Sequence, residues 1–259
     1  MTFNYDTDDT DNIIEKEMEL FDPDYIAINY RQFLCYNEEF DNWFNFIYIT
    51  LPQSNIKWVK FGADFNNSID DLPDDIEYIY FDDATNFNQK VNKFPKNLKK
   101  ITLFGFNPII NQLPYTLKYL ESHNYYNDTN TFYYDGIINF PPNLIALYIS
   151  RFNVNTENYN YLPITLKSLH ICTPYNSTKT INLNNLPHGL KYLYIYGNNK
   201  ISIDCNNLPD NIDQLILYGV YTNIYKLPKS LKYFDLDIDN PFSEEIKKRF
   251  PDIEIELTF

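Results

Sequence analysis

Three histidines and three cysteines are the residues of this chain that could do chemistry. His123, His170 and His188 lie in different segments, and Cys172 follows His170 by two positions. A cysteine becomes a nucleophile beside a histidine when a third group orients that histidine. The pair has no such orienting partner. The sequence also contains no Cys-x-x-Cys pair, glycine-rich phosphate loop or His-Glu-x-x-His motif. We therefore expect no enzyme, no catalytic residue, no metal site and no cofactor.

Acidic residues dominate the first 24 positions, where nine Asp and Glu stand against Lys16 alone. The run from Asp6 to Glu17 imitates a calcium loop, but Asp11 stands where the loop needs glycine. Acidic segments with few aromatics stay solvated. We predict a flexible segment over residues 1–24.

The formal net charge of the chain is −14, which repels phosphate backbones and argues against a nucleic-acid partner. The sequence shows no signal peptide and no run of 18 apolar residues, so no membrane role is expected. Cys35, Cys172 and Cys205 are odd in number and far apart, which is typical of reduced thiols. We expect an intracellular protein in the cytoplasm of the cell or host cell, with a place in a virus particle as the alternative, and a monomer by default.

The spacing of prolines defines the organisation of the chain. A Leu-Pro or Phe-Pro pair returns at intervals of 19 to 27 residues. Such a period indicates a solenoid built from units that cannot bury their apolar face alone. The ten repeated prolines are Pro52, Pro73, Pro95, Pro114, Pro141, Pro163, Pro187, Pro209, Pro228 and Pro251.

Each unit carries aliphatics three, six and eight positions after its Pro, as in Leu190, Leu193 and Ile195 after Pro187. The alternation at positions six and eight predicts one short strand with those side chains facing inward. Proline suits the corner before the strand, because it lacks an N–H and fixes φ. Glycines lie ten residues after their Pro, where we expect each strand to end; these are Gly105, Gly197 and Gly219, with Gly62 equivalent.

We therefore predict a leucine-rich-repeat-like solenoid with a parallel β-sheet on its concave face, short irregular or 3₁₀ return segments and capped ends. The repeats cover residues 51–240, an N-terminal cap covers 25–50, and a C-terminal cap of a short helix plus the last strand covers 241–259. Ser243 is expected to cap that helix at its N-terminus.

A second signature precedes the Leu-Pro step in three units. It reads Phe65-Asn66-Asn67-Ser68-Ile69, Phe87-Asn88-Gln89-Lys90-Val91 and Phe106-Asn107-Pro108-Ile109. This resembles the FNIP repeat, a leucine-rich-repeat variant known from social amoebae and giant DNA viruses. The resemblance covers about residues 51–259. Some family members carry an N-terminal F-box that recruits a ubiquitin ligase, but the segment before Leu51 does not show that motif.

Two surfaces could bind a partner. Position four after the Pro is Lys in most units (Lys99, Lys118, Lys167, Lys191 and Lys232, with Lys57 equivalent), which would form a basic row along one sheet edge. The alternative is that these lysines only cover apolar surface.

Positions five, seven and nine should point to the concave face. Rows of tyrosine there favour protein binding. The alternative is that the rings only stack into a ladder that stabilises neighbouring strands. The predicted partner-binding residues are Trp58, Tyr78, Tyr80, Tyr119, Tyr148, His170, Tyr192, Tyr194, Tyr196, Tyr218 and Tyr233.

The resulting hypothesis is a non-enzymatic module that binds a protein partner on the concave face of a repeat solenoid. Two alternatives stay open at this point. One is a ubiquitin-ligase substrate adaptor without a recognisable F-box, and the other is a structural or packaged component of a giant-virus particle.

Overall fold

The computed structural model describes residues 58–61, 65–81, 87, 89–104, 113–123, 140–150, 162–173, 181–183, 185–201 and 203–258. The chain divides into two compact units, Met1–Leu51 and Pro52–Phe259, and every described residue belongs to the second. The predicted acidic segment 1–24 and the predicted cap 25–50 lie outside the described residues. The boundaries of the four predicted regions therefore stay predictions.

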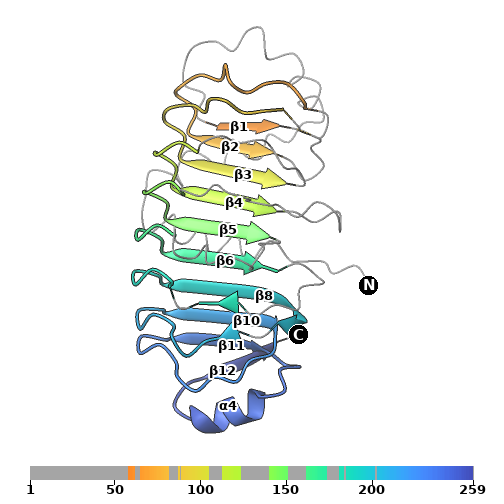
Figure 1. The fold of residues 1–259 in the computed structure, drawn as a ribbon, viewed down its shortest axis with the longest axis vertical. Helices are drawn as coiled ribbons and strands as arrows, with labels where there is room; N and C mark the ends of the chain where they lie inside the picture. Colours follow the sequence, from red (N-terminus) through yellow and green to blue (C-terminus); the bar gives the residue numbers. More distant parts are fainter. Residues whose placement is uncertain are drawn as a thin grey trace. The chain divides into compact units, whose positions relative to one another are not determined.

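A parallel sheet of ten strands organises the second unit (Figure 1). The strands lie side by side in chain order, so each repeat pairs with the repeats before and after it, and this confirms the predicted solenoid. The strands are β1 (Trp58–Phe61), β2 (Tyr78–Phe81), β3 (Lys100–Phe104), β4 (Tyr119–His123), β5 (Ala146–Ser150), β6 (Ser168–Cys172), β8 (Tyr192–Ile201), β10 (Gln214–Val220), β11 (Tyr233–Asp237) and β12 (Ile255–Thr258).

The core lies under the face that carries positions six and eight. Leu193 pairs in register with Leu169 and Leu215, and all three are at most 1% exposed. Aliphatic or aromatic side chains continue both rows through the described strands, as the alternation predicts. The exception is Ser122 in β4, whose Oγ is buried without a hydrogen-bond partner.

The proline corner is a tight turn closed by the proline's own carbonyl. The amide of Leu166 donates to Pro163 O at 3.0 Å, and Leu190 donates to Pro187 O at the same distance. This turn lowers the apolar residue at position three into the core, where both leucines are fully buried. It also explains why proline is tolerated, because only its carbonyl is needed there.

The described return segments consist of turns and irregular chain, together with a two-stranded sheet of β7 (Ile181–Asn182) and β9 (Ile203–Asp204). In the first units, Phe65 and Phe87 of the Phe-Asn signature fill the core. The ring centroids of Phe65 and Phe87 lie 5.9 Å apart, and Phe65 lies 4.0 Å from Phe61. The signature therefore has a packing role in this chain.

The prediction that strands end at the repeated glycines is correct for two units and wrong for two. Strands β1 and β3 end at Phe61 and Phe104, directly before Gly62 and Gly105, whereas β8 and β10 continue through Gly197 and Gly219. Gly219 has φ of 57°, and the pairing with β8 shifts by three residues here, from Tyr218 opposite Tyr196 to Val220 opposite Ile201. A Cβ on Gly197 would lie 2.5 Å from Gly219 O. In these two strands, glycine thus permits a strand irregularity and a close backbone approach rather than a strand end.

The short helix near the C-terminus is α4 (Ser243–Arg249), followed by β12. The prediction that Ser243 is its N-cap is wrong, because Phe242 holds that position and makes no side-chain capping bond. Asn240 organises the helix entry instead. Its Oδ1 accepts from the Phe242 amide at 2.9 Å, while its Nδ2 donates to Val220 O at 2.9 Å.

Candidate functional site

The strand register brings the predicted aromatic residues into rows on the second face of the sheet, called here the aromatic face. It carries positions five, seven and nine. At position seven, Tyr148 pairs with His170, which pairs with Tyr194. At position five, Trp58 pairs with Tyr78, and at position nine Tyr196 pairs with Tyr218. Tyr80 holds position seven in β2, Tyr119 and Tyr192 hold position five in β4 and β8, and Tyr233 does so in β11.

The expected exposure of this face is wrong at four of the predicted binding residues. Tyr78 and Tyr119 are each 7% exposed, His170 is 1% exposed and Tyr194 is 0% exposed. The others whose side chains are described are partly exposed; these are Tyr80, Tyr148, Tyr192, Tyr196, Tyr218 and Tyr233. The side chain of Trp58 lies outside the described residues. Partner binding by the aromatic face stays a prediction, restricted to the partly exposed positions.

Ring stacking explains part of this burial. The ring centroids of His170 and Tyr194 lie 4.0 Å apart, and those of Tyr148 and His170 lie 5.6 Å apart. The Tyr194 hydroxyl donates to Gln214 Oε1 at 2.8 Å. This bond satisfies a hydroxyl that would be costly to bury without a hydrogen-bond partner. These contacts favour the stabilising-ladder alternative for the centre of the face.

Two carboxylates accept hydrogen bonds from tyrosines of the aromatic face. Asp235, 2% exposed, accepts a hydrogen bond from the Tyr218 hydroxyl at 2.6 Å. The Tyr233 hydroxyl donates to Glu256 Oε2 at 2.7 Å. Burial, together with this bond to a carboxylate, raises the pKa of Tyr233 above its ordinary value. The hydroxyls of Tyr218 and Tyr233 therefore act as hydrogen-bond donors that hold these carboxylates in place.

The His170–Cys172 pair lacks the arrangement of an activated nucleophile. His170 Nε2 lies 3.2 Å from Ser168 Oγ, and Cys172 Sγ lies 3.2 Å from the Tyr148 hydroxyl. Desolvation raises the pKa of the Cys172 thiol to about 11, whereas a nucleophilic cysteine needs a lowered pKa. Within the described ranges, no three His, Cys, Asp or Glu side chains gather as metal ligands would.

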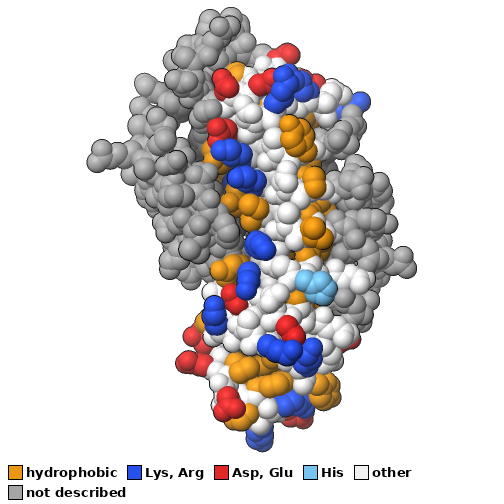
Figure 2. All heavy atoms as spheres, turned by 90° about the vertical axis from the view of Figure 1, so that its left-hand side faces the viewer, with side chains coloured by type: hydrophobic (Ala, Val, Ile, Leu, Met, Phe, Trp, Pro, Cys, Tyr) orange, Lys and Arg blue, Asp and Glu red, His pale blue; other side chains and the backbone are white. Residues whose placement is uncertain are grey.

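The other predicted surface is the turn edge, defined here as the sheet edge where the strands begin, with positions one to four after each Pro. It forms the left side of Figure 1 and faces the viewer in Figure 2, where basic side chains form a column. Backbone hydrogen bonds place the position-four residues of consecutive units side by side in one row. The amides of Lys118, Ile145 and Lys167 donate to Lys99 O, Lys118 O and Ile145 O, respectively, each at 2.7 Å.

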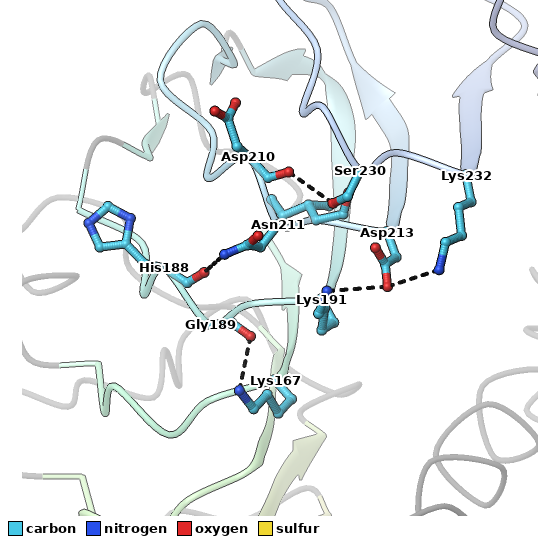
Figure 3. Close-up of polar contacts among 10 residues, drawn as sticks. Lys167, His188, Gly189, Lys191, Asp210, Asn211, Asp213, Ser230 and Lys232 are labelled. Carbon is cyan, nitrogen blue, oxygen red and sulfur yellow. Dashed lines mark hydrogen bonds and ion pairs between the residues drawn. The ribbon is translucent and has the colours of Figure 1, made fainter.

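Carboxylates at the same position of other units neutralise part of the lysine row. Lys99 Nζ lies 2.7 Å from Glu77 Oε2. Lys191 and Lys232 lie 3.5 Å and 3.4 Å from one oxygen of Asp213 (Figure 3). The row predicted from the sequence therefore exists, but three of its lysines are paired within the chain.

Two lysines differ from these three. Lys167 Nζ donates to Gly189 O at 3.3 Å, and a carbonyl does not neutralise its charge (Figure 3). No ion pair or hydrogen bond of the Lys118 ammonium is found among the described residues. Lys118 and Lys167 flank Ile145, and none of the three side chains is fully buried.

Side chains at position two tie five of the described turns to the preceding turn, which the sequence analysis missed. Thr165 Oγ1 lies 2.8 Å from Pro142 O and 2.7 Å from Leu144 O. The available signal was the recurrence of Thr, Asn or Ser two residues after Pro. Thr116 and Ser230 bridge carbonyls in the same way, and the Asn143 amide donates to Tyr115 O. The Asn211 amide donates to His188 O (Figure 3).

A groove of about 570 Å³ runs along the turn edge, from the start of β2 to the start of β6. Two apolar side chains at position one, next in the chain to the lining residues Thr116 and Thr165, are exposed: Tyr115 is 71% and Ile164 is 86% exposed. Figure 2 shows a column of hydrophobic side chains beside the basic column. The groove is lined by Glu77, Asn97, Lys99, Thr116, Lys118, Asn143, Ile145 and Thr165.

The parallel ladder, the proline turn before each strand and the buried aliphatics at positions three, six and eight define a solenoid of the leucine-rich-repeat type. Across the described residues, no helix has the length and apolarity needed to cross a bilayer.

No family model and no curated protein matches the chain. Among solved structures, CroV588, described as a circular leucine-rich-repeat protein, is 25% identical with a TM-score of 0.44. YopM from Yersinia enterocolitica WA-314 is 18% identical with a TM-score of 0.43. Each match covers 73% of this chain but only 34% of CroV588 and 47% of YopM, so the chain spans about a third and about half of their lengths.

Proposed function

We propose that this protein is a non-enzymatic interaction module that binds a protein partner in the turn-edge groove. Solenoids of this type commonly serve as protein-interaction scaffolds. The observation that carries the proposal is the combination, at one edge, of a groove lined by Lys118, whose ammonium has no ion pair among the described residues, and of the exposed Tyr115 and Ile164, which adjoin the lining residues Thr116 and Thr165 in the chain. Exposed apolar side chains rimmed by polar ones are typical of protein-binding surfaces.

The rigidity of the edge supports the proposal. The side chains of Thr116, Asn143 and Thr165 bond their turns to the preceding ones, so this part of the groove is held before a partner arrives. A preformed site loses less conformational entropy on binding.

The raised pKa of Cys172 supports the absence of thiol chemistry.

The aromatic face, which the sequence predicts as the partner site, is the second candidate surface. Tyr192 and Tyr196 are partly exposed on this face of β8, on either side of the buried Tyr194, and tyrosine supplies contact area at low entropic cost. The turn edge ranks first because Tyr115 and Ile164 are far more exposed than any described tyrosine of that face.

Site-specific photo-crosslinking tests the proposal. The full chain carries p-benzoylphenylalanine in place of Tyr115 or, as a matched control, in place of Tyr225, an exposed tyrosine in the return segment after β10. We expect a discrete adduct from Tyr115 alone. The captured protein is then purified, and its affinity is measured for the native chain, Lys118→Glu and Tyr196→Ala.

Loss of affinity with Lys118→Glu alone supports the groove, whereas loss with Tyr196→Ala alone supports the aromatic face. Equal adducts from Tyr115 and Tyr225 would reject the groove. The identity of the captured protein also tests the two alternatives. A cullin-linker protein would indicate a ubiquitin-ligase adaptor, and a particle protein would indicate a virion component.

A further inference from the structure

The position-four row has a specific charge pattern beneath the groove. Along consecutive units it reads Lys99, Lys118, Ile145 and Lys167. The charge of Lys99 is balanced by Glu77. Among the described lysines of this row, the two without a carboxylate partner, Lys118 and Lys167, therefore stand on either side of Ile145.

This pattern contrasts with the rest of the molecule, because the whole chain carries −14. Lys118, which lines the groove, and Lys167, the next position-four residue beyond Ile145, form a local site for negative charge in such a protein. The overall negative charge disfavours nucleic acid, which is a long polyanion. A short acidic segment of a protein interacts mainly with the charges within a Debye length of it, here the two lysines. Charge complementarity thus favours carboxylates on a polypeptide as the groove's occupant.

The spacing of the two cations limits the shape of that segment. Lys118 and Lys167 belong to units two strands apart, which corresponds to about 9.6 Å at the usual strand separation. A polyproline II segment advances about 3.1 Å per residue with three residues per turn, so residues i and i+3 lie on the same side of the segment about 9.3 Å apart. Two acidic side chains at positions i and i+3 of a segment extended in this way therefore match the spacing of Lys118 and Lys167 along the row.

The residues between the cations suit the middle of such a segment. Ile145 lies between Lys118 and Lys167 in the row and offers an apolar contact. Asn143 uses its amide Nδ2 on Tyr115 O, which leaves Oδ1 to accept a backbone N–H from the bound segment. The exposed Tyr115 and Ile164 of position one adjoin lining residues of the same stretch in the chain.

We infer that the groove binds an extended acidic segment of a protein partner, with two carboxylates three residues apart and an apolar residue between them. The inference rests on the proposed function and adds the chemistry and spacing of the partner. Lys118 and Lys167 hold the two carboxylates, and Ile145 contacts the apolar side chain.

Fluorescence anisotropy with the full chain tests this inference. The probe is a fluorescein-labelled peptide, acetyl-Gly-Ser-Glu-Leu-Leu-Glu-Ser-Gly-amide. The comparison peptides place the two Glu side by side or replace both by Lys, and a labelled single-stranded oligothymidine tests nucleic acid. The protein variants are Lys118→Glu, Lys118→Arg and the matched control Lys248→Glu, at an exposed position of α4.

We expect the spaced acidic peptide to bind most tightly, and Lys118→Glu to weaken it at least about fivefold, the loss of one or two solvent-accessible ion pairs. Lys118→Arg and Lys248→Glu should bind within about twofold of the native chain, and salt near 0.5 M should weaken binding. Circular dichroism and the urea midpoint of each variant establish that it is folded.

Binding of the lysine peptide, preference for oligothymidine, or insensitivity to Lys118→Glu would overturn the inference. So would binding of neither acidic peptide at millimolar concentration. If the peptides fail while Tyr115 still yields a crosslinked partner, the inference falls and the proposed function stands. If Tyr115 also yields no partner, both fall.

Discussion

Replacing Thr165 by Val should show how much the position-two side chains stabilise the stack. The Thr165 hydroxyl has one proton to share between Pro142 O at 2.8 Å and Leu144 O at 2.7 Å. Valine keeps the shape of the side chain but leaves both carbonyls without this donor. Thr165 is half-buried, so water can replace part of the interaction. We expect a loss of about 1 kcal/mol in the free energy of unfolding, the net value of one such hydrogen bond.

Urea unfolding followed by circular dichroism measures this loss. With a slope of about 2 kcal/mol per molar urea, about 1 kcal/mol corresponds to a midpoint shift of about 0.5 M. Thr165→Ser retains the hydroxyl and should shift the midpoint by less than half as much. Ile164→Ala, at the exposed neighbouring position, should leave it nearly unchanged. If Thr165→Val unfolds at the native midpoint, the hydroxyl does not couple the turns and the reasoning is refuted.

Three further predictions concern the core, the aromatic face and a buried thiol. Tyr194→Ala should cost about 3–5 kcal/mol in urea unfolding and Tyr192→Ala about 1 kcal/mol or less, because only Tyr194 is fully buried; equal small losses would contradict the ladder. Ser122→Val should raise the free energy of unfolding by about 1 kcal/mol by removing an unpaired buried hydroxyl, and a lowered urea midpoint would speak against this. Burial raises the pKa of the Cys205 thiol from 9.0 to about 12, so its stabilising contribution is complete below pH 9 and is lost as the pH rises through 12. Urea titrations at pH 8 and pH 10 should therefore show that the free energy of unfolding falls more for the native chain than for Cys205→Ala. The difference is roughly 1.4 kcal/mol per pH unit between the two pKa values, and equal losses would exclude the thiol as the cause.

The strand order could be predicted from the sequence because it depends on spacing alone. Each Leu-Pro pair begins a unit too small to bury its own aliphatics, so consecutive units must lie side by side. Period two then assigns Leu193 and Ile195 to the core face, where both are fully buried. These inferences need no knowledge of any contact between distant residues.

Exposure of the aromatic face could not be predicted in the same way. Alternation assigns Tyr192 and Tyr194 to one face, but it does not distinguish a partly exposed side chain from a buried one. The difference depends on neighbours across the strands. Tyr194 stacks on His170 and donates to Gln214, contacts between residues 20 or more positions apart in the chain.

The glycines and Ser243 show a second limit, which concerns irregular backbone. Gly219 does lie at the predicted phase, but the sequence cannot show whether a positive φ ends a strand or bends one. Ser243 fits the composition of an N-cap, yet Asn240 takes over the helix entry because its side chain also reaches Val220 O. Tertiary contacts decide between two local solutions that the sequence permits equally.

The turn edge is the part of the repeat best suited to vary between partners. Positions three, six and eight are committed to the core, and substitution there removes buried contacts that hold neighbouring units together. Position four is different, because its backbone makes the bonds of the ladder while its side chain points out of the core. Lys118, Ile145 and Lys167 therefore differ in chemistry although their amides make the same 2.7 Å bond to the preceding unit. A solenoid of this kind can change the sequence of charges along its edge, and with it the spacing of carboxylates it selects, without altering the stack that holds them.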